Sequence, residues 1–169
     1  MKDIKNILVP TDFSVTARNA FHYAKVLAQA CDACVTVVHI NQYFLPISEI
    51  AVAPQSAQQD DVVDEAMATF IEDEKDAANT VVKVDVATKI LRGDPVSRLV
   101  ELSQHADVDL IVMGTTGLQD FISKIIGSTS LEVSNKARCP VVLVPREARW
   151  KRVEKIMFST TYEAASPKW

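Results

Sequence analysis

Short, nearly continuous apolar runs recur along most of the chain. They are rich in β-branched residues and show little alternation of polar and apolar positions, which is typical of strands in a parallel sheet covered on both faces. Five such runs lie at residues 5–9, 33–40, 81–91, 109–114 and 140–144. The hydrophobic pattern therefore predicts five strands, and those at 5–9, 33–40 and 109–114 are the most continuously apolar.

Between these strands, apolar residues recur at intervals of three and four, which predicts amphipathic helices with one buried face. The helices are expected at about residues 15–30, 60–79 and 128–136, with another that begins at Pro95. Ser14 is placed to cap the first of them, and proline suits the first position of a helix. The proline-containing segment 41–59 is predicted to form a surface loop that covers a site or meets a partner.

Regular alternation of strand and helix implies right-handed crossovers and one parallel, doubly wound sheet. We therefore predict an α/β fold with an open five-stranded sheet. Ligands of such sheets bind beyond the carboxyl ends of the strands, where the winding reverses. Three predicted strand ends meet at that crevice, namely residues 10–12, 39–41 and 113–114.

A glycine-spaced loop follows the third of these strand ends. The chain has four glycines, and three of them lie in this loop, at Gly114, Gly117 and Gly127. Phosphate must be met by several N–H groups at close range, which favours residues without a Cβ and the free N–H groups at the start of a helix. The next three residues add hydroxyl donors, Ser128, Thr129 and Ser130. The loop is thus predicted to bind phosphate, unless its glycines only form turns and Ser128 only caps the helix.

The spacing of this loop, G-x2-G-x9-G-S, differs from the P-loop pattern G-x-x-x-x-G-K-[ST] and from the dinucleotide pattern G-x-G-x-x-G. It resembles the ATP-binding class of the universal stress protein family, whose hallmark is G-x2-G-x9-G-[ST]. The resemblance extends over about residues 3–146. It includes the opening strand and turn ILVPTDFS at 7–14, the strand end VHI at 38–40 and the closing strand CPVVLV at 139–144.

This resemblance implies an adenine nucleotide alpha hydrolase-like sheet, with strand order 3-2-1-4-5, and a bound ATP whose phosphates hold Mg2+. It implies that Asp12 accepts hydrogen bonds from the ribose hydroxyls and that the backbone of Ile40 recognises the adenine edge. Apolar walls come from Pro10, Ile40 and Met113. The expected binding set is Pro10, Thr11, Asp12, Ile40, Met113, Gly114, Gly117, Gly127, Ser128, Thr129 and Ser130. The alternatives are that Asp12 only stabilises the start of the first helix and that the apolar residues are ordinary core.

The resemblance further implies a cytoplasmic, nucleotide-dependent sensor or interaction module of the stress response. No Ser-His-Asp or paired-carboxylate arrangement is evident in the sequence, and we interpret His39 as a packed histidine, so we expect slow ATP hydrolysis or none. One alternative is an ATP-using transferase or ligase of the same fold, but the turn at 10–14 lacks the S-G-G-x-[DS]-like loop of that class. Another is a non-binding dimerisation module, against which the complete glycine spacing argues.

Composition narrows the partners and the compartment. The 169 residues carry a net charge of -4, so no overall field predicts binding to nucleic acid or to an anionic membrane. The N-terminus lacks a signal-peptide pattern and no segment approaches the roughly 20 apolar residues of a membrane span, which favours the cytoplasm. Three cysteines do not suit a disulfide framework, and we interpret the C-x-x-C of Cys31 and Cys34 as part of a turn.

The last part of the chain resembles its beginning. Residues 155–162, KIMFSTTY, align without gaps on residues 6–13, NILVPTDF, which indicates a duplicated unit. Tandem domains are also implied by the family resemblance. We therefore divide the chain into a nucleotide-binding domain at 1–146 and a linker plus the first strand of an incomplete second repeat at 147–169. The alternative is a helical or disordered tail.

The last strand of the first domain is a predicted contact between copies of the chain. An edge strand exposes unpaired N–H and C=O groups, for which a second copy supplies partners. Members of the resembled family usually dimerise through this strand, so the resemblance implies a homodimer through residues 141–144.

Overall fold

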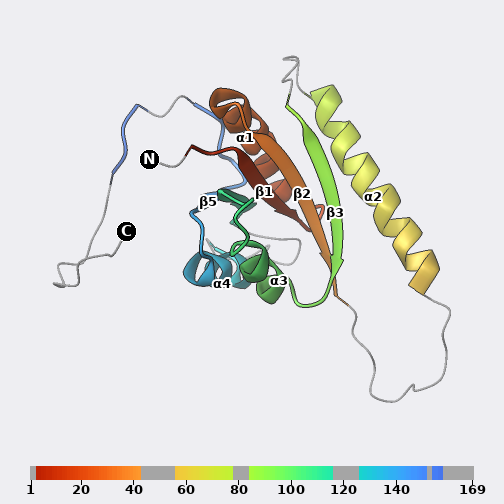
Figure 1. The fold of residues 1–169 in the computed structure, drawn as a ribbon. Helices are drawn as coiled ribbons and strands as arrows, with labels where there is room; N and C mark the ends of the chain where they lie inside the picture. Colours follow the sequence, from red (N-terminus) through yellow and green to blue (C-terminus); the bar gives the residue numbers. More distant parts are fainter. Residues whose placement is uncertain (1–2, 43–55, 78–83, 116–125, 152–153, 158–169) are drawn as a thin grey trace.

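The computed structural model describes residues 3–42, 56–77, 84–115, 126–151 and 154–157, and for helix residues 56–60 and 73–77 the backbone alone. Strands and helices alternate along these residues (Figure 1). They are β1 (Asn6–Thr11), α1 (Val15–Cys31), β2 (Cys34–Asn41), α2 (Ser56–Ala77), β3 (Val86–Arg92), α3 (Pro95–Leu102), β4 (Leu110–Gly114), α4 (Ser128–Lys136) and β5 (Val141–Val144).

One parallel sheet holds these strands in the order β3-β2-β1-β4-β5. Helices α1 and α2 pack on one face, and α3 and α4 on the other, because the chain first winds from β1 to β3 and then crosses to β4 and β5 (Figure 1). The predicted α/β fold and strand order are confirmed. Since the winding reverses between β1 and β4, a ligand crevice is expected at their carboxyl ends.

Each face of the sheet has its own hydrophobic core. Helix α1 buries a stripe of small residues around Phe21, which lets its backbone approach the sheet, and Met67 and Phe70 of α2 complete this core. The opposite core joins α3 and α4 to the sheet through Leu8, Val38, Ile40, Leu99, Leu102, Ile111, Met113 and Val133. Burial on both faces explains why the central strands β1, β2 and β4 lack alternation, whereas the edge strand β3 is largely exposed. None of the helices in the described ranges is both long and apolar enough to cross a membrane.

Predicted and observed bounds agree closely for α1, α4 and the start of α3, while α2 and β3 differ. Helix α2 begins at Ser56 rather than Asp60, so no acidic residue lies in its first turn. The alanine and glutamines ahead of Asp60 are good helix formers, and the sequence prediction wrongly assigned them to the loop. Strand β3 begins at Val86 rather than residue 81, because it pairs residue by residue with β2, which itself begins at Cys34.

The paired ladder of β1 and β4 stops before the carboxyl ends of the two strands. Among the described residues, their ladder ends at the pair Leu8 and Ile111. The carbonyl of Asn6 accepts a hydrogen bond from the Asp109 amide at 3.0 Å, so every second residue from Asn6 onward directs its backbone toward β4. Pro10 is one of these residues and has no N–H to donate. Among the described residues, the ladder of the two strands therefore stops short of the edge where ligands of such sheets bind.

The segment after β5 lies against α1, although the sequence suggests a linker. The side-chain amide of Asn19 donates to the carbonyl oxygens of Pro145 and Ala148, both at 2.9 Å. The rings of Tyr23 and Trp150 meet edge to face with their centroids 4.8 Å apart. These contacts extend the packed domain beyond its last strand.

The described part of the tail, residues 154–157, belongs to no helix or strand. Ile156 and Met157 expose 87% and 94% of their surface in this single chain. Residues 158–162 lie outside the described ranges, so the second repeat stays a prediction.

Candidate functional site

Several chain segments meet at the carboxyl edge of the sheet, beside the point where its winding reverses. The end of β4 touches the first turn of α1, where a Cβ added to Gly114 would lie 2.7 Å from Thr16 Cγ2. It also touches the first turn of α4, because Ser130 Oγ donates to the Gly114 carbonyl at 2.7 Å. The turn that carries Asp12 leads from β1 into the same helix α1. The predicted residues at the ends of β1 and β4 and at the start of α4 thus lie at one edge.

Gly114 has a packing role that its sequence context does not reveal. Carbon atoms do not pack at 2.7 Å, so a larger residue here would push β4 away from Thr16. The absence of a Cβ therefore serves contact between β4 and α1. Approach of a phosphate to Gly114 stays a prediction, and Gly117 lies outside the described residues.

Side-chain hydrogen bonds hold the turn between β1 and α1. Thr11 Oγ1 accepts from the Phe13 amide at 2.9 Å, and Asp12 Oδ1 accepts from the Ser14 amide at 3.1 Å. Ser14 caps α1 as predicted, because its Oγ accepts from the Ala17 amide at 3.1 Å. Phe13 has a φ of 62°, a left-handed conformation that costs roughly 1 to 2 kcal/mol for residues other than glycine. Asp12 thus supports the start of α1, and its approach to a ribose stays a prediction.

Among the residues that the structure describes, helix α4 begins without a side-chain cap. Its N-cap is Gly127, and Ser128 is the first helical residue, so the alternative that Ser128 only caps the helix is wrong. The first backbone hydrogen bond of the helix runs from the Leu131 amide to the Gly127 carbonyl at 3.0 Å. The amides of residues 128–130 therefore have no partner within the helix. Together with the exposed hydroxyls of Ser128 and Thr129, they form an end rich in hydrogen-bond donors.

Helix α3 begins at the same edge of the sheet but carries a carboxylate cap. Asp94 Oδ2 accepts hydrogen bonds from the amide and the hydroxyl of Ser97, each at 2.8 Å. These bonds, the amide first, lower the pKa of Asp94 below its usual value, because they stabilise the charged carboxylate. The Ser97 donors at this helix end are thus met from within the protein.

Two hydrogen bonds join the ends of the loop between β4 and α4. One is the bond from Ser130 to Gly114, and the other runs from the Gly127 amide to the carbonyl of Thr115. Ser130 is only 5% exposed, so its hydroxyl anchors the helix to the strand. Thr115 is buried, and its amide donates to the Val144 carbonyl at 3.1 Å. The sequence did not single out Thr115, because it acts through backbone atoms that every residue has.

The predicted apolar walls are part of the protein core. Ile40 and Met113 are buried in the cluster beneath α3 and α4, while Pro10 is half-buried at the end of β1 and Thr11 is buried. Their burial agrees with the alternative of ordinary core packing. Contact between these side chains and a base stays a prediction.

A stacked aromatic pair lies beside the turn of β1 and α1. The rings of Phe13 and His39 are 4.5 Å apart and inclined by 24°, and His39 Nδ1 lies 2.9 Å from the Thr11 carbonyl oxygen. His39 is packed at a strand end, as predicted. Sequence reasoning missed the role of Phe13, because a left-handed aromatic residue is uncommon and no residue type signals it.

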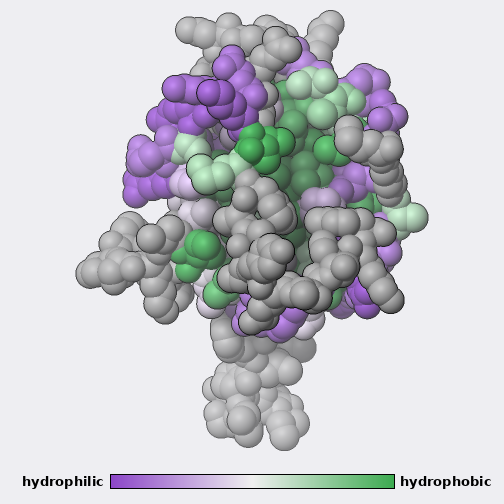
Figure 2. Space-filling view, turned by 90° about the vertical axis from the view of Figure 1, so that its left-hand side faces the viewer, coloured by the Kyte–Doolittle hydropathy of each residue, from purple (hydrophilic) through white to green (hydrophobic). Residues whose placement is uncertain are grey.

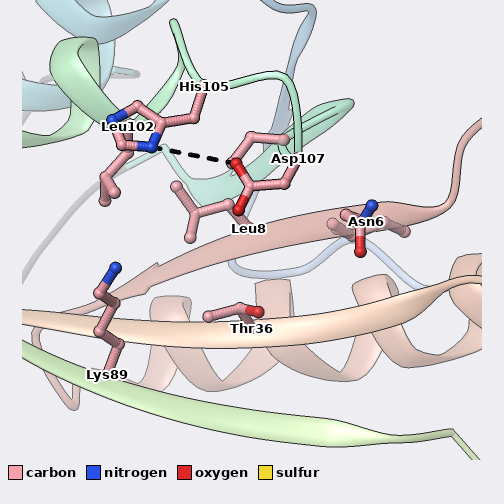
Figure 3. A pocket seen from close by; sticks show the side chains of 9 residues that line it. Asn6, Leu8, Thr36, Lys89, Leu102, His105 and Asp107 are labelled. Atoms are coloured by element: carbon pink, nitrogen blue, oxygen red, sulfur yellow. Dashed lines mark ion pairs between the residues drawn. The ribbon is translucent and has the colours of Figure 1, made fainter.

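A separate cavity of about 130 Å³ lies toward the amino ends of β1 and β4, beside the end of α3 (Figure 3). Its lining combines polar and apolar side chains from Asn6, Ile7, Leu8, Thr36, Lys89, Leu102, His105, Asp107 and Val108. His105 Nδ1 lies 4.0 Å from Asp107 Oδ1. Within the described ranges, no three His, Cys, Asp or Glu side chains form a possible metal site. None of the residues that line the cavity belongs to the predicted binding set, so the cavity is distinct from the predicted site.

Comparison with known proteins agrees with this architecture. The model of the universal stress protein family matches residues 3–145. The universal stress protein in the QAH/OAS sulfhydrylase 3'region of Thermus aquaticus is 34% identical over 145 residues, which cover 83% of this chain and 98% of that protein. The solved structure of hypothetical protein MJ0577 is 27% identical, has a TM-score of 0.66 and covers 88% of this chain and 100% of its own.

Two more distant solved structures carry adenine nucleotides. A universal stress protein in complex with cAMP is 23% identical with a TM-score of 0.61 and covers 86% of this chain and 99% of its own. One from Archaeoglobus fulgidus in complex with dAMP is 21% identical with a TM-score of 0.54 and covers 85% and 99%. At these identities the likeness establishes the shared fold. Because the family model matches residues 3–145 of this chain, the chain belongs to the universal stress protein family.

Proposed function

We propose that the carboxyl ends of β1 and β4 form the binding site for ATP or another adenine nucleotide, and that the protein acts as a nucleotide-dependent sensor or interaction module of the stress response. The observation that carries this proposal is the start of α4, which has no side-chain cap and is anchored beside the end of β4. Relatives of the same fold bind cAMP and dAMP, which supports an adenine nucleotide as ligand.

In this proposal the phosphates lie at the start of α4. The amides of residues 128–130 and the positive end of the helix dipole meet their negative charge, and the Ser128 and Thr129 hydroxyls add donors. Asp12 accepts from the ribose hydroxyls, and the Ile40 backbone meets the adenine edge. Mg2+ is held through the phosphate oxygens.

The same residues suit binding better than rapid hydrolysis. A fast ATPase needs a group that positions or deprotonates a water molecule near the terminal phosphate. Asp12 Oδ1 accepts from the Ser14 amide, and His39 Nδ1 lies at hydrogen-bond distance from the Thr11 carbonyl. Both groups thus have structural contacts, and we infer slow turnover or none.

Calorimetric titration with ATP, ADP and AMP in the presence of Mg2+ tests the proposal. The wild type is expected to bind ATP, and Gly117→Val to bind it at least about tenfold more weakly, because a branched side chain obstructs close approach of the loop backbone. His105→Ala, at the separate cavity, is the matched control and should bind as the wild type does. No ATP binding by the wild type would refute the function, and equal binding by Gly117→Val would refute the role of the loop.

We also propose that two copies pair through β5, the edge strand of the sheet. The three residues Val141, Val142 and Leu143 are only half-buried, and Figure 2 shows apolar side chains gathered on the side of the molecule where β5 lies. The Val144 carbonyl accepts from the amide of Thr115, directly after β4, so Leu143 directs its backbone groups to the opposite, open edge.

Light scattering during size-exclusion chromatography tests this pairing. We expect the wild type to be a dimer and Leu143→Pro to be a monomer with an unchanged circular dichroism spectrum, because proline removes an N–H at the open edge only. A monomeric wild type, or a dimeric and folded Leu143→Pro, would contradict pairing through β5.

A further inference from the structure

We propose that Phe13 and His39 are positioning residues for nucleotide recognition. Their stacked rings hold the turn between β1 and α1, and the turn sets the carboxylate of Asp12 for the ribose hydroxyls. This inference rests on the nucleotide site proposed above and extends it to two residues that do not themselves contact the ligand.

The backbone of Phe13 needs external support. Its φ of 62° lies in the left-handed region, which an aromatic residue adopts only when its surroundings hold it there. The Phe13 amide donates to Thr11 Oγ1 at 2.9 Å, which holds the backbone from one side. The ring must hold it from the other.

The ring of Phe13 is held between β2 and α2. It stacks on His39 at 4.5 Å and meets the edge of Phe70 at 5.8 Å with an angle of 68°. Phe70 is itself buried and stacks on Phe21 of α1 at 5.6 Å. The turn is therefore attached through one side chain to elements of the core that do not move easily.

His39 connects this packing to the strand that carries the site. It lies opposite Thr11 in the register of β1 and β2, and its Nδ1 is 2.9 Å from the Thr11 carbonyl oxygen. A carbonyl can only accept, so Nδ1 carries the proton. The imidazole thus fixes the residue before Asp12 by a hydrogen bond and the residue after it by stacking.

Asp12 lies between these two fixed residues, and its Oδ1 accepts from the Ser14 amide at 3.1 Å. A return of Phe13 to negative φ would rotate the peptide groups on both sides of it and break this bond. The stack therefore preorganises the carboxylate, which lowers the ordering needed when a ribose binds. Its loss should weaken recognition of the ribose hydroxyls and leave phosphate binding at α4 intact.

The test compares Mg2+ complexes of ATP and of 2′,3′-dideoxy-ATP, which lacks the ribose hydroxyls. Calorimetry is performed on the wild type, Asp12→Asn, His39→Ala and the double variant. We expect His39→Ala to lower the affinity for ATP about tenfold and the affinity for dideoxy-ATP less than twofold. The double variant should bind ATP no more weakly than Asp12→Asn, because His39 acts through Asp12.

Matched variants separate positioning from general packing. Phe13→Tyr keeps the stack and should bind ATP within about twofold of the wild type, whereas Phe13→Gly accepts the backbone conformation but lacks the ring and should behave like His39→Ala. His105→Ala removes an exposed imidazole far from the turn and should change nothing. Equal losses for ATP and dideoxy-ATP in His39→Ala, or additive losses in the double variant, would overturn the positioning role.

Amide hydrogen exchange without nucleotide examines the turn directly. The Ser14 amide, which donates to Asp12, should exchange at least about tenfold faster in His39→Ala than in the wild type. Unchanged protection would refute the claim that the stack holds the turn. A wild type that binds neither nucleotide would refute the proposed site and the ribose role of Asp12, while the exchange rates would still decide whether His39 holds the turn.

Discussion

The starts of α3 and α4 lie at the same edge of the sheet, and each follows a glycine. They differ in whether a side chain caps the first backbone amides. At α3, Gly93 is followed by Asp94, whose carboxylate accepts from Ser97 and caps the helix. At α4, Gly127 itself is the cap and supplies no side chain. One helix end carries its own anion, and the other has no side-chain cap among the described residues.

This difference shows why the presence of a helix start alone does not indicate a binding site. Both ends have a positive dipole, but a capped end gains little from a second anion because its amide already has a partner. The uncapped end of α4 is also anchored to β4 by Ser130, so its donors are held in place. An open and anchored helix start is what the proposed phosphate site requires.

The largest effect is expected when the start of α4 is given a carboxylate cap like the one at the start of α3. In Gly127→Asp a carboxylate would cap α4 and repel the phosphates, so affinity for ATP should fall on the order of 100-fold while the melting temperature stays equal or rises slightly. Calorimetry and thermal unfolding measure the two effects. Gly127→Asn caps without charge and should lose less affinity. Undiminished ATP binding by Gly127→Asp would contradict the proposal that the phosphates bind at the start of α4.

A smaller effect is expected when the hydrogen bond that anchors the start of α4 to β4 is removed. Ser130→Ala leaves the Gly114 carbonyl without its donor, which should lower the free energy of unfolding by about 1 to 2 kcal/mol and ATP affinity several-fold. Ser134→Ala is the matched control, because that exposed hydroxyl donates to the Leu131 carbonyl within the same helix. Denaturant unfolding and calorimetry on both variants separate anchoring from a general effect on α4. Equal results for the two serines would contradict the anchor.

Removal of the Asp94 cap from the start of α3 should affect stability only. Asp94→Ala deprives the Ser97 amide of its acceptor, so the melting temperature should fall by a few degrees. ATP affinity should stay within about twofold of the wild type. Asp107→Ala, an exposed aspartate at the separate cavity, serves as the control. Weaker ATP binding by Asp94→Ala than by the control would mean that α3 also belongs to the ligand site.

The smallest effect concerns pH. The pKa of Asp94 is lower in the folded protein than its ordinary value of 3.8, so the folded state favours the charged form. The stabilisation is therefore fully present above that ordinary value and is lost as pH falls through the lower folded value. Thermal unfolding between about pH 5 and pH 2 should show a smaller acid-induced loss in Asp94→Asn than in the wild type. Parallel curves for the two proteins would contradict this.

The two helix ends also show how far the sequence predicts the site. The bounds of α4, the cap at Ser14 and the meeting of β1 and β4 ends follow from local patterns and from the rules of parallel sheets. The interpretation of Ser128 as a possible cap failed, since the choice between two neighbouring residues depends on the backbone angles of Gly127. The contact between Gly114 and Thr16 was missed, because those residues are distant in sequence and meet only in the fold.

By itself the sequence determined the strand and helix types, the doubly wound fold and the edge of the sheet at which the predicted binding residues gather, because periodicity, glycine spacing and crossover handedness are local or general properties. Only the tertiary structure shows that α4 has no side-chain cap among the described residues, that a Cβ at Gly114 would clash with Thr16, and that Phe13 and His39 stack beside Asp12. Those features depend on distances between residues far apart in the chain, and such distances exist only once both cores have packed.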